Sequence, residues 1–445
     1  MFDPAKVHET IGKYMLVDGN QMVVDLEKSH GAFLHDSLTG KEFIDFFTFF
    51  ASIPVGHNHA KMREAAFLEK LTASAVSKPS SSDFYTTFMA EFVEAFGRVA
   101  MPESMKHLFL ISGGALAVEN ALKTGFDWKV RKNHERLSKT GANFQIEGLG
   151  SKVIHFKEAF HGRSGYTMSL TNTDDPRKYM YFPKFNWPRI VNPKLQFPIT
   201  DDVIAEVEKL EAIAFEQIEM AVRQFKGDIA CLIIETIQGE GGDNHFRPEF
   251  FAGLRRLADE HEFLFILDEI QSGMGITGKM WAIEHTDVMP DVIAFGKKSQ
   301  VCGIIAGPRI DEVKGNVFEE SSRINSTFGG NLVDMVRATR YLEIIEEENL
   351  LAHTEKVGSH MIAGLKTIAE ESKGVISNVR GKGFMIAYDL PSPDKRNTMI
   401  KTLSDNGLKA LKSGNRSIRF RGMLDTPQEV VDQALEIVAK SIPME

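Results

Sequence analysis

The chain has 445 residues, of which 43% are hydrophobic and 25% are charged, and its net charge is −9. This length predicts a large buried core divided between a larger and a smaller domain. The acidic net charge argues against nucleic acid or an anionic membrane as a partner. Because no run of about 18 apolar residues occurs and Met1–Pro4 shows no signal-peptide pattern, we expect a cytoplasmic protein without a membrane segment.

The sequence contains two cysteines, Cys231 and Cys302. Two cysteines do not form a disulfide framework. Cys231 lies within an apolar strand pattern, so we interpret it as a small buried hydrophobic residue. Cys302 follows the candidate site described below, and a structural role is favoured over a nucleophilic one.

The N-terminal hundred residues show three patterns. Residues 3–15 have helical periodicity. Residues 22–50 alternate in polarity around the turn sequence DSLTG, which predicts a hairpin. Helical periodicity returns at residues 60–100, where Ser81, Ser82 and Asp83 are candidate N-caps for the second helix.

Between residues 100 and 310, short apolar runs alternate with amphipathic stretches. The apolar runs at 108–111, 153–156 and 229–234 predict buried strands, and longer periodic stretches at 201–225 and 248–261 predict helices. Strand–helix alternation of this kind predicts a doubly wound α/β domain with a mostly parallel sheet.

The pattern changes after Gly330. Helices are predicted at about 332–348 and 351–372, followed by a strand pair near 375–390 and a strand at Ser417–Phe420. The sequence TPQE then predicts a capping box and a last helix. These elements indicate a small α+β domain that packs against the large one.

Two apolar runs in the middle of the chain end in side chains that can do chemistry. Phe263–Leu267 ends at Asp268, and Val292–Phe295 leads through a glycine to Lys297. Because ligands bind beyond the carboxyl ends of strands in open α/β sheets, both side chains should reach one crevice. Pyridoxal phosphate (PLP) uses such a pair, since it binds a lysine covalently and takes an acid at its pyridine nitrogen.

A second candidate feature follows the strand at 108–111, where Ser112-Gly113-Gly114-Ala115 opens an amphipathic helix. Free N–H groups at such a helix N-terminus form a site for anions such as phosphate. Tight turns between strands and helices also require glycine, so this feature alone is weak.

Several longer motifs occur in the same order as in one enzyme family: LHDSLTGKEFIDFF, GHNH, FHGR, IIETIQGEGG, LDEIQSGMGITG, AFGKK and NSTFGGN. The chain therefore resembles the class III (omega) aminotransferases, which have the type I PLP-transferase fold. The resemblance implies PLP as cofactor. It also implies a large domain at 61–331 and a small domain formed by 332–445 together with the N-terminal segment 1–60.

Within that family, GGALAVENALK, QGEGGDNHFRPEFF and AFGKKSQVCG are similar to members that act on L-lysine. The resemblance implies transfer of the ε-amino group of L-lysine to 2-oxoglutarate, giving 2-aminoadipate 6-semialdehyde and L-glutamate. The semialdehyde should cyclise to piperideine-6-carboxylate. The alternative is an omega-aminotransferase of the ornithine or GABA type. A non-catalytic PLP-binding regulator is disfavoured, because the motifs begin near residue 30 and leave no room for a DNA-binding segment.

The resemblance also assigns cofactor contacts. It implies that Lys297 is the Schiff-base lysine, that Asp268 holds the pyridine nitrogen and that Gln271 contacts the ring hydroxyl. Phe160 would stack on the ring, and Glu235 is a further cofactor-binding candidate.

Phosphate contacts are assigned to Gly114 and Ala115, and to Ser326 and Thr327. The family receives the latter hydroxyl contact from the partner subunit, which implies a homodimer with composite active sites. No metal is expected.

The resemblance also assigns substrate recognition to four residues. Arg419 would bind the α-carboxylate of 2-oxoglutarate, and Glu240 would cover that arginine during the lysine half-reaction. Arg163 would hold the distal carboxylate, and Asn325 is a further substrate-binding candidate. Arg421 is an alternative to Arg419 as the partner of the α-carboxylate. The alternative interpretation of Glu240 and of Arg163 is that each forms an ordinary surface ion pair.

Overall fold

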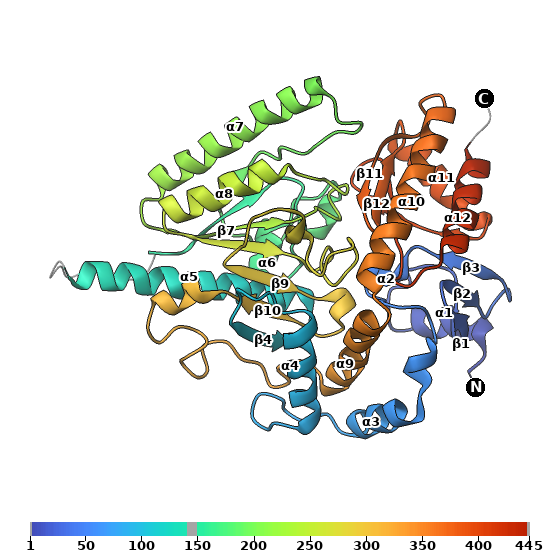
Figure 1. The fold of residues 1–445 in the computed structure, drawn as a ribbon, viewed down its shortest axis with the longest axis horizontal. Helices are drawn as coiled ribbons and strands as arrows, with labels where there is room; N and C mark the ends of the chain where they lie inside the picture. The colour runs from blue at the N-terminus through green and yellow to red at the C-terminus, as the bar shows by residue number, and fades with distance from the viewer. Residues whose placement is uncertain (1, 140–148, 443–445) are drawn as a thin grey trace.

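The computed structural model describes residues 2–139 and 149–442. Its centre is a seven-stranded sheet in the order β4-β10-β9-β8-β7-β5-β6 (Figure 1). Only β10 is antiparallel to its neighbours in this sheet, so the predicted mostly parallel α/β fold is confirmed. The strands are β4 (His107–Ile111), β5 (Lys152–Phe156), β6 (Arg189–Ile190), β7 (Ile229–Glu235), β8 (Leu264–Asp268), β9 (Val292–Phe295) and β10 (Cys302–Ala306).

Both faces of this sheet are buried, and alternate strand residues belong to different cores. Leu264 and Ile266 pack beneath α5, whereas Phe265 and Leu267 pack on the opposite face with side chains of α4, α7, α8 and α9. Such two-sided burial explains why the strands are continuous apolar runs. The covering helices are α4 (Thr87–Val99), α5 (Gly114–Ser138), α7 (Asp201–Gln224), α8 (Pro248–Glu260) and α9 (Leu332–Glu347).

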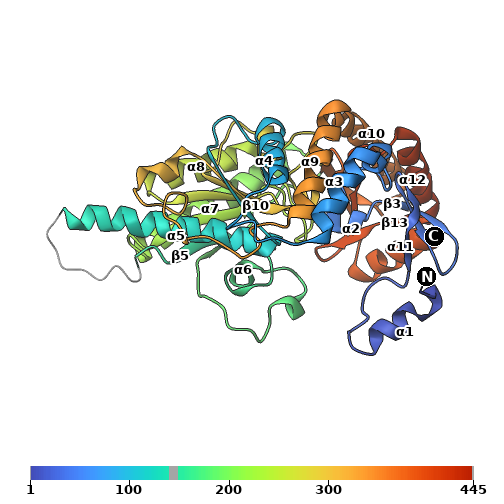
Figure 2. The same ribbon diagram turned by 90° about the horizontal axis from the view of Figure 1, so that it is seen from below.

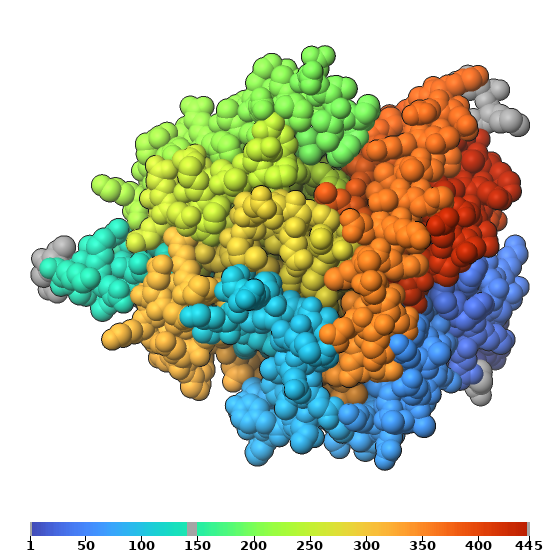
Figure 3. Space-filling model, viewed as in Figure 1, coloured from blue at the N-terminus to red at the C-terminus, as the bar shows by residue number. Residues whose placement is uncertain are grey.

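A second body is built from both ends of the chain. The sheet β11-β12-β15-β14 packs with three helices, and β13 pairs in parallel with β3 of the N-terminal hairpin sheet. The blue N-terminal residues therefore lie beside the red C-terminal ones (Figures 1 and 3). The elements are β1 (Val24–His30), β2 (Phe33–Asp36), β3 (Glu42–Asp45), α10 (Leu350–Glu371), β11 (Ser377–Lys382), β12 (Met385–Asp389), α11 (Pro393–Asp405), β13 (Leu408–Lys409), β14 (Leu411–Ser413), β15 (Ser417–Arg421) and α12 (Gln428–Ser441).

Shorter helices occur along the whole chain, and Figure 2 shows the long helix α5 extending past the end of the large sheet. The proposed domain boundaries at 60 and 331 stay a prediction, and residues 1 and 443–445 lie outside the described part of the chain. The short helices are η1 (Pro4–Lys6), α1 (Val7–Gly12), α2 (Thr48–Ala51), η2 (Ala60–Arg63), α3 (Ala65–Val76), α6 (Gly165–Leu170), η3 (Pro176–Lys178), η4 (Ala282–His285), η5 (Lys297–Ser299) and η6 (Pro308–Glu312).

Two predicted helix caps are wrong. The hydroxyl of Thr86, rather than Ser81, Ser82 or Asp83, caps α4 by accepting a hydrogen bond from Met89 N at 3.1 Å. At α12 the N-cap is Pro427 and makes no side-chain cap. Among the described residues, no helix combines the length and apolar character needed to cross a bilayer.

Candidate active site

The carboxyl ends of three neighbouring strands bring the predicted acid and lysine together. Asp268 ends β8 and is the register partner of Glu235, which ends β7. Asp268 is also paired with Ala294 of β9, three residues before Lys297. Parallel alignment therefore places both carboxylates and the lysine at one edge of the sheet.

Asp268 is buried and has two partners. Its Oδ2 lies 2.7 Å from Nδ1 of His161, and its Oδ1 accepts a hydrogen bond from the backbone N–H of Ile270 at 3.0 Å. The other ring nitrogen of His161, Nε2, is buried without a hydrogen-bond partner. The sequence patterns assigned no role to His161, although it directly follows Phe160 in the FHGR motif.

Glu235 joins two loops beneath the site. Its Oε1 accepts a hydrogen bond from Phe160 N at 2.8 Å, and its Oε2 accepts one from Gly239 N at 3.0 Å. Burial raises the pKa of Glu235 to about 7. The carboxyl group therefore fixes the loops that carry Phe160 and Glu240.

Lys297 lines a cavity of about 830 Å³ together with Phe160, Arg163, Glu240, Gln271 and Arg419. Within the described part of the chain, the Lys297 ammonium makes no hydrogen bond, so it is free to react. Burial, followed by the neighbouring charge of Arg419, lowers the pKa of Lys297 to about 8. Desolvation favours the neutral amine, which is the nucleophilic form.

Arg419 lies on β15 and is almost fully buried. Its Nη2 donates to Glu240 Oε2 at 2.6 Å and its Nη1 to Gln271 Oε1 at 3.2 Å, while its Nε is buried without a partner. Glu240 also forms an ion pair with Lys178. Burial by itself raises the pKa of Glu240, but these two cations outweigh it and hold the pKa below its usual value.

Arg421, the alternative carboxylate partner, is occupied. Its Nη1 and Nη2 donate to the two carboxylate oxygens of Asp243, each at 2.7 Å, and both residues are fully buried. Arg421 also donates to Gln271 Oε1 at 2.8 Å. The Gln271 amide oxygen therefore faces both arginines, and its predicted contact with the ring hydroxyl stays a prediction.

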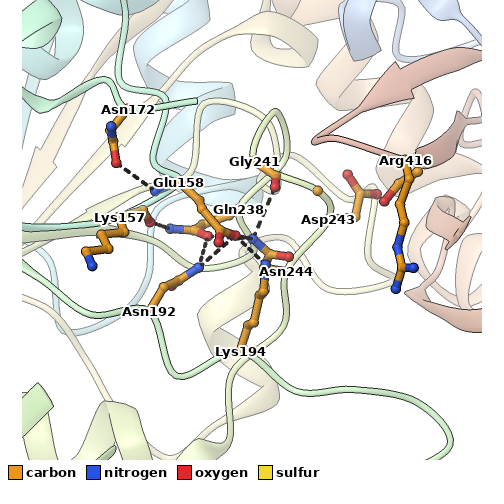
Figure 4. A network of polar contacts seen from close by, with 12 residues as sticks. Lys157, Glu158, Asn172, Asn192, Lys194, Gln238, Gly241, Asp243, Asn244 and Arg416 are labelled. Atoms are coloured by element: carbon orange, nitrogen blue, oxygen red, sulfur yellow. Dashed lines mark hydrogen bonds and ion pairs between the residues drawn. The ribbon is translucent and has the colours of Figure 1, made fainter. Parts of the chain in front are cut away.

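A polar network supports the loop that carries Glu240 (Figure 4). Gln238 Oε1 accepts hydrogen bonds from Asn192 and Asn244, both at 2.8 Å, and Gln238 Nε2 donates to Lys157 O at 2.9 Å. Glu158 Oε2 accepts a further bond from Asn244 at 2.8 Å. These bonds order the backbone of the loop from which the Glu240 side chain projects.

The predicted anion turn lies beside this edge. Gly113 has φ +109°, a conformation that favours glycine, and α5 begins after it without a side-chain cap and without an acid in its first turn. A Cβ on Gly114 would lie 3.1 Å from the side chain of Ile270, and one on Gly162 would lie 2.7 Å from the Ala115 Cβ. Close backbone packing thus keeps free N–H groups next to the Asp268 and Phe160 loops.

Of four further predicted substrate or phosphate contacts, the structure brings Arg163 into the cavity that Lys297 lines and leaves the other three outside it. Arg163 lines the cavity, but its exposed guanidinium has no polar partner among the described residues. Asn325, Ser326 and Thr327 lie outside the cavity lining, and Asn325 and Thr327 are exposed. The predicted roles of Asn325, Ser326 and Thr327 therefore stay predictions.

The residues present fit PLP. A reactive lysine of lowered pKa faces a buried acid, and an uncapped helix N-terminus with no first-turn acid lies nearby to take a phosphate. This lysine and acid at neighbouring strand ends of a mostly parallel sheet define a type I PLP-transferase.

Comparisons with known proteins agree with this class. A family model for class-III aminotransferases matches residues 14–442. Proteins named L-lysine-epsilon aminotransferase from Amycolatopsis lactamdurans and Mycobacterium tuberculosis are 47% and 46% identical over 442 residues, covering 99% of this chain and 96% of each relative. The solved structure described as lysine aminotransferase from M. tuberculosis in the internal aldimine form has a TM-score of 0.95 at 46% identity and covers 99% of both chains. The chain therefore belongs to the class-III aminotransferases, and its cofactor is pyridoxal 5′-phosphate.

Proposed function

We propose that this aminotransferase transfers the ε-amino group of L-lysine to 2-oxoglutarate. The products are 2-aminoadipate 6-semialdehyde, which cyclises to piperideine-6-carboxylate, and L-glutamate. Full-length relatives at 46–47% identity carry the name L-lysine-epsilon aminotransferase, which supports this substrate pair. The observation that carries the proposal is the ion pair between Glu240 and Arg419 in a cavity that also contains the unpaired cation Arg163.

The two substrates place different groups beside Arg419. When lysine reacts through its ε-amine, the neighbouring atoms are methylenes, and an uncovered buried arginine there would be costly. Glu240 neutralises Arg419 in this half-reaction. 2-Oxoglutarate instead brings an α-carboxylate next to its reacting carbonyl, and Arg419 binds that carboxylate after Glu240 moves aside. Arg163 holds the distal carboxylate of either substrate.

Arg419 is preferred to Arg421 for this role because of their partners. Arg421 is held by both oxygens of the buried Asp243, whereas Arg419 shares a half-buried carboxylate that also contacts the cavity. Glu240 is half-buried, so moving it away from Arg419 does not strand a fully buried acid. Moving Asp243 away from Arg421 would leave a fully buried charge uncompensated.

Lys297 acts as the proton-transfer group. Its lowered pKa raises the share of neutral amine, which would take the proton from the ε-carbon of lysine and deliver it to the reacting carbon of the cofactor. PLP, when bound, supplies an electron-withdrawing ring that stabilises negative charge at the reacting carbon. Asp268, oriented by its bond to His161, would keep the pyridine nitrogen protonated, because a neighbouring negative charge favours the charged form.

The remaining roles concern how PLP is held. Phe160 would stack on the ring, Gln271 and Glu235 would complete its polar surroundings, and the N–H groups of Gly114 and Ala115 would bind the phosphate.

Ser326, Thr327 and Asn325 reach the site from the partner subunit of a homodimer. In their own chain all three lie outside the cavity, and Asn325 and Thr327 are exposed. Both cysteines, Cys231 and Cys302, are free thiols, as is usual in the reducing cytoplasm, and we place the enzyme there.

Single half-reactions test the substrate assignment. The holoenzyme is mixed separately with L-lysine, L-ornithine, GABA or 2-aminoadipate, and the visible absorbance band of the bound cofactor is followed. We expect lysine to bleach the band at least about tenfold faster than the other amines, a transition-state preference of about 1.4 kcal/mol, and to give a product that traps as a cyclic imine. Faster bleaching by ornithine or GABA would move the assignment to that alternative. Failure of every amine would contradict an amine-donor reaction at this site.

A further inference from the structure

Lys178 is a cation of the cavity that the sequence patterns did not single out. It ends η3, and its side chain is 15% exposed. Its ammonium forms an ion pair with Glu240 Oε1 and lies 5.7 Å from the centre of the Phe160 ring. Lys178 thus touches the residue proposed to cover Arg419 and lies near the residue proposed to stack on the cofactor.

Glu240 bridges two cations through different oxygens. Oε2 accepts the hydrogen bond from Arg419 at 2.6 Å, whereas Oε1 contacts Lys178. The bond to Arg419 can therefore break while the contact with Lys178 remains. A half-buried carboxylate that lost Arg419 without a second cation would be left poorly compensated.

The backbone on both sides of this ion pair is held in place. Gly414 N donates to Glu240 O at 2.9 Å, and Ser413 Oγ donates to Gly239 O at 2.6 Å. On the other side, Tyr179 Oη donates to Thr173 O at 3.1 Å. These bonds hold the backbone of the Glu240 loop and the residue that follows Lys178, so Lys178 stays within reach of the Glu240 side chain.

We propose that Lys178 is a positioning residue for substrate exchange, because it retains one oxygen of Glu240 when Arg419 is released to a substrate carboxylate. Lys178 then lowers the cost of admitting the dicarboxylate acceptor without contacting it. This inference rests on the proposed use of Arg419 by 2-oxoglutarate. It assigns to Lys178 a role in acceptor affinity and none in the reaction of the lysine ε-amine.

Binding of glutarate, a five-carbon dicarboxylate without a reacting carbonyl, tests the proposal in the holoenzyme. Its dissociation constant is measured by spectral titration of the bound cofactor for wild type, Lys178→Met, Glu240→Gln and the double variant. We expect Lys178→Met to weaken glutarate binding about tenfold, because Glu240 then has Arg419 as its remaining cation. In the Glu240→Gln background, the same substitution should change the constant less than about twofold.

Two further variants separate charge from position. Lys178→Arg keeps a cation near Glu240 and should remain within about threefold of wild type. Lys184→Met is the matched control, since Lys184 lies on the same segment, donates to Tyr179 O and Phe182 O, and does not line the cavity. It should leave glutarate affinity unchanged.

The kinetics should show the same difference between the two substrates, with an effect on the acceptor and none on lysine. Lys178→Met should raise KM for 2-oxoglutarate and leave the rate of the lysine half-reaction unchanged. An equal loss of glutarate affinity with Glu240 or Gln at position 240 would show that Lys178 binds the dicarboxylate directly, and would overturn the proposal. Unchanged affinity in Lys178→Met would also overturn it. Because glutarate binding needs no amine donor, failure of lysine as substrate would be detected separately in the wild type.

Discussion

At the residue scale, the reactivity of Lys297 follows from its position immediately after a buried strand. Its backbone has φ +52°, an uncommon conformation for a residue with a side chain, and directs the chain into η5. Burial and the nearby Arg419 together disfavour the charged ammonium. The fold thus raises the share of neutral amine before any cofactor arrives.

The pH dependence of cofactor loading tests this lysine. Apoenzyme is mixed with PLP, and formation of the covalent bond is followed by its visible absorbance from pH 6 to 10. Because the neutral amine attacks, the rate should rise with pH and level off above a midpoint of about 8, whereas the ordinary lysine pKa is about 10.4. Nα-acetyl-lysine serves as the free-amine control, and Lys297→Ala should form no such bond. A midpoint for the enzyme equal to that of the free amine would contradict the argument.

The sequence predicted some contacts of this site and missed others for a physical reason. Asp268 and Lys297 could be paired in advance because parallel strands end at one edge of a sheet. The bond between His161 and Asp268 joins residues 107 positions apart, and that between Lys178 and Glu240 spans 62. Loop conformation determines such contacts, and no periodic pattern in a sequence records it.

At the element scale, α2 is a left-handed turn. Its four residues, Thr48 to Ala51, have φ of +42°, +48°, +61° and +70°. Left-handed helical residues with side chains cost roughly 1–2 kcal/mol each, so other contacts must hold the turn. Asp45 Oδ1 accepts a hydrogen bond from Thr48 N at 2.7 Å, and Thr48 Oγ1 donates to Arg421 O at 2.9 Å.

Lys298 fastens the chain after this turn to the loop that follows β15. Its buried ammonium donates to Ile53 O at 2.8 Å and to Gly422 O at 3.1 Å. A sequence pattern does not distinguish such a residue from a surface lysine, since its partners lie 245 and 124 positions away.

Substitution of Lys298 by Met should therefore destabilise the fold. Loss of two buried hydrogen bonds predicts a decrease of about 2–4 kcal/mol in the free energy of unfolding. Burial lowers the pKa of Lys298 to about 7, so between pH 7 and about 10.4 the unfolded chain binds the extra proton and wild-type stability rises with pH through this group. The deficit of the variant should be larger at pH 9 than at pH 7 in urea denaturation.

The exposed Lys401 supplies the matched control for that measurement. Lys401→Met should change the free energy of unfolding by less than about 0.5 kcal/mol. A deficit for Lys298→Met no greater than that of the control would show that the two carbonyl contacts carry no stability.

Helix boundaries illustrate how tertiary contacts overrule local patterns. Ser80 Oγ donates to Thr327 O at 2.6 Å, and Ser82 Oγ lies 3.4 Å from the same oxygen, so this serine-rich stretch contacts a distant loop. Thr86 is left to cap α4. Thr426 Oγ1 likewise donates to Met423 O at 2.8 Å, which removes it from the predicted capping box.

At the scale of the whole molecule, the site is assembled from both bodies of the chain. Lys297 and Asp268 stand on the large sheet, whereas Arg419 lies on β15 of the small one. The loop containing Thr327 is exposed outside the cavity of its own chain and is tied to Ser80. A partner subunit that contributes this loop would complete the phosphate contacts.

Mixed dimers test whether the sites are composite. Lys297→Ala removes the reactive amine, and Thr327→Glu places a negative charge where the partner is proposed to contact the phosphate, so each variant alone should be inactive. When the two are unfolded and refolded together in equal amounts, half of the dimers are mixed, and each mixed dimer has one site with a native Lys297 and a native partner Thr327. About a quarter of wild-type activity should return if subunits pair at random. If each chain built its own site, every site would carry one lesion and refolding together would restore nothing, which the same lysine half-reaction assay would show.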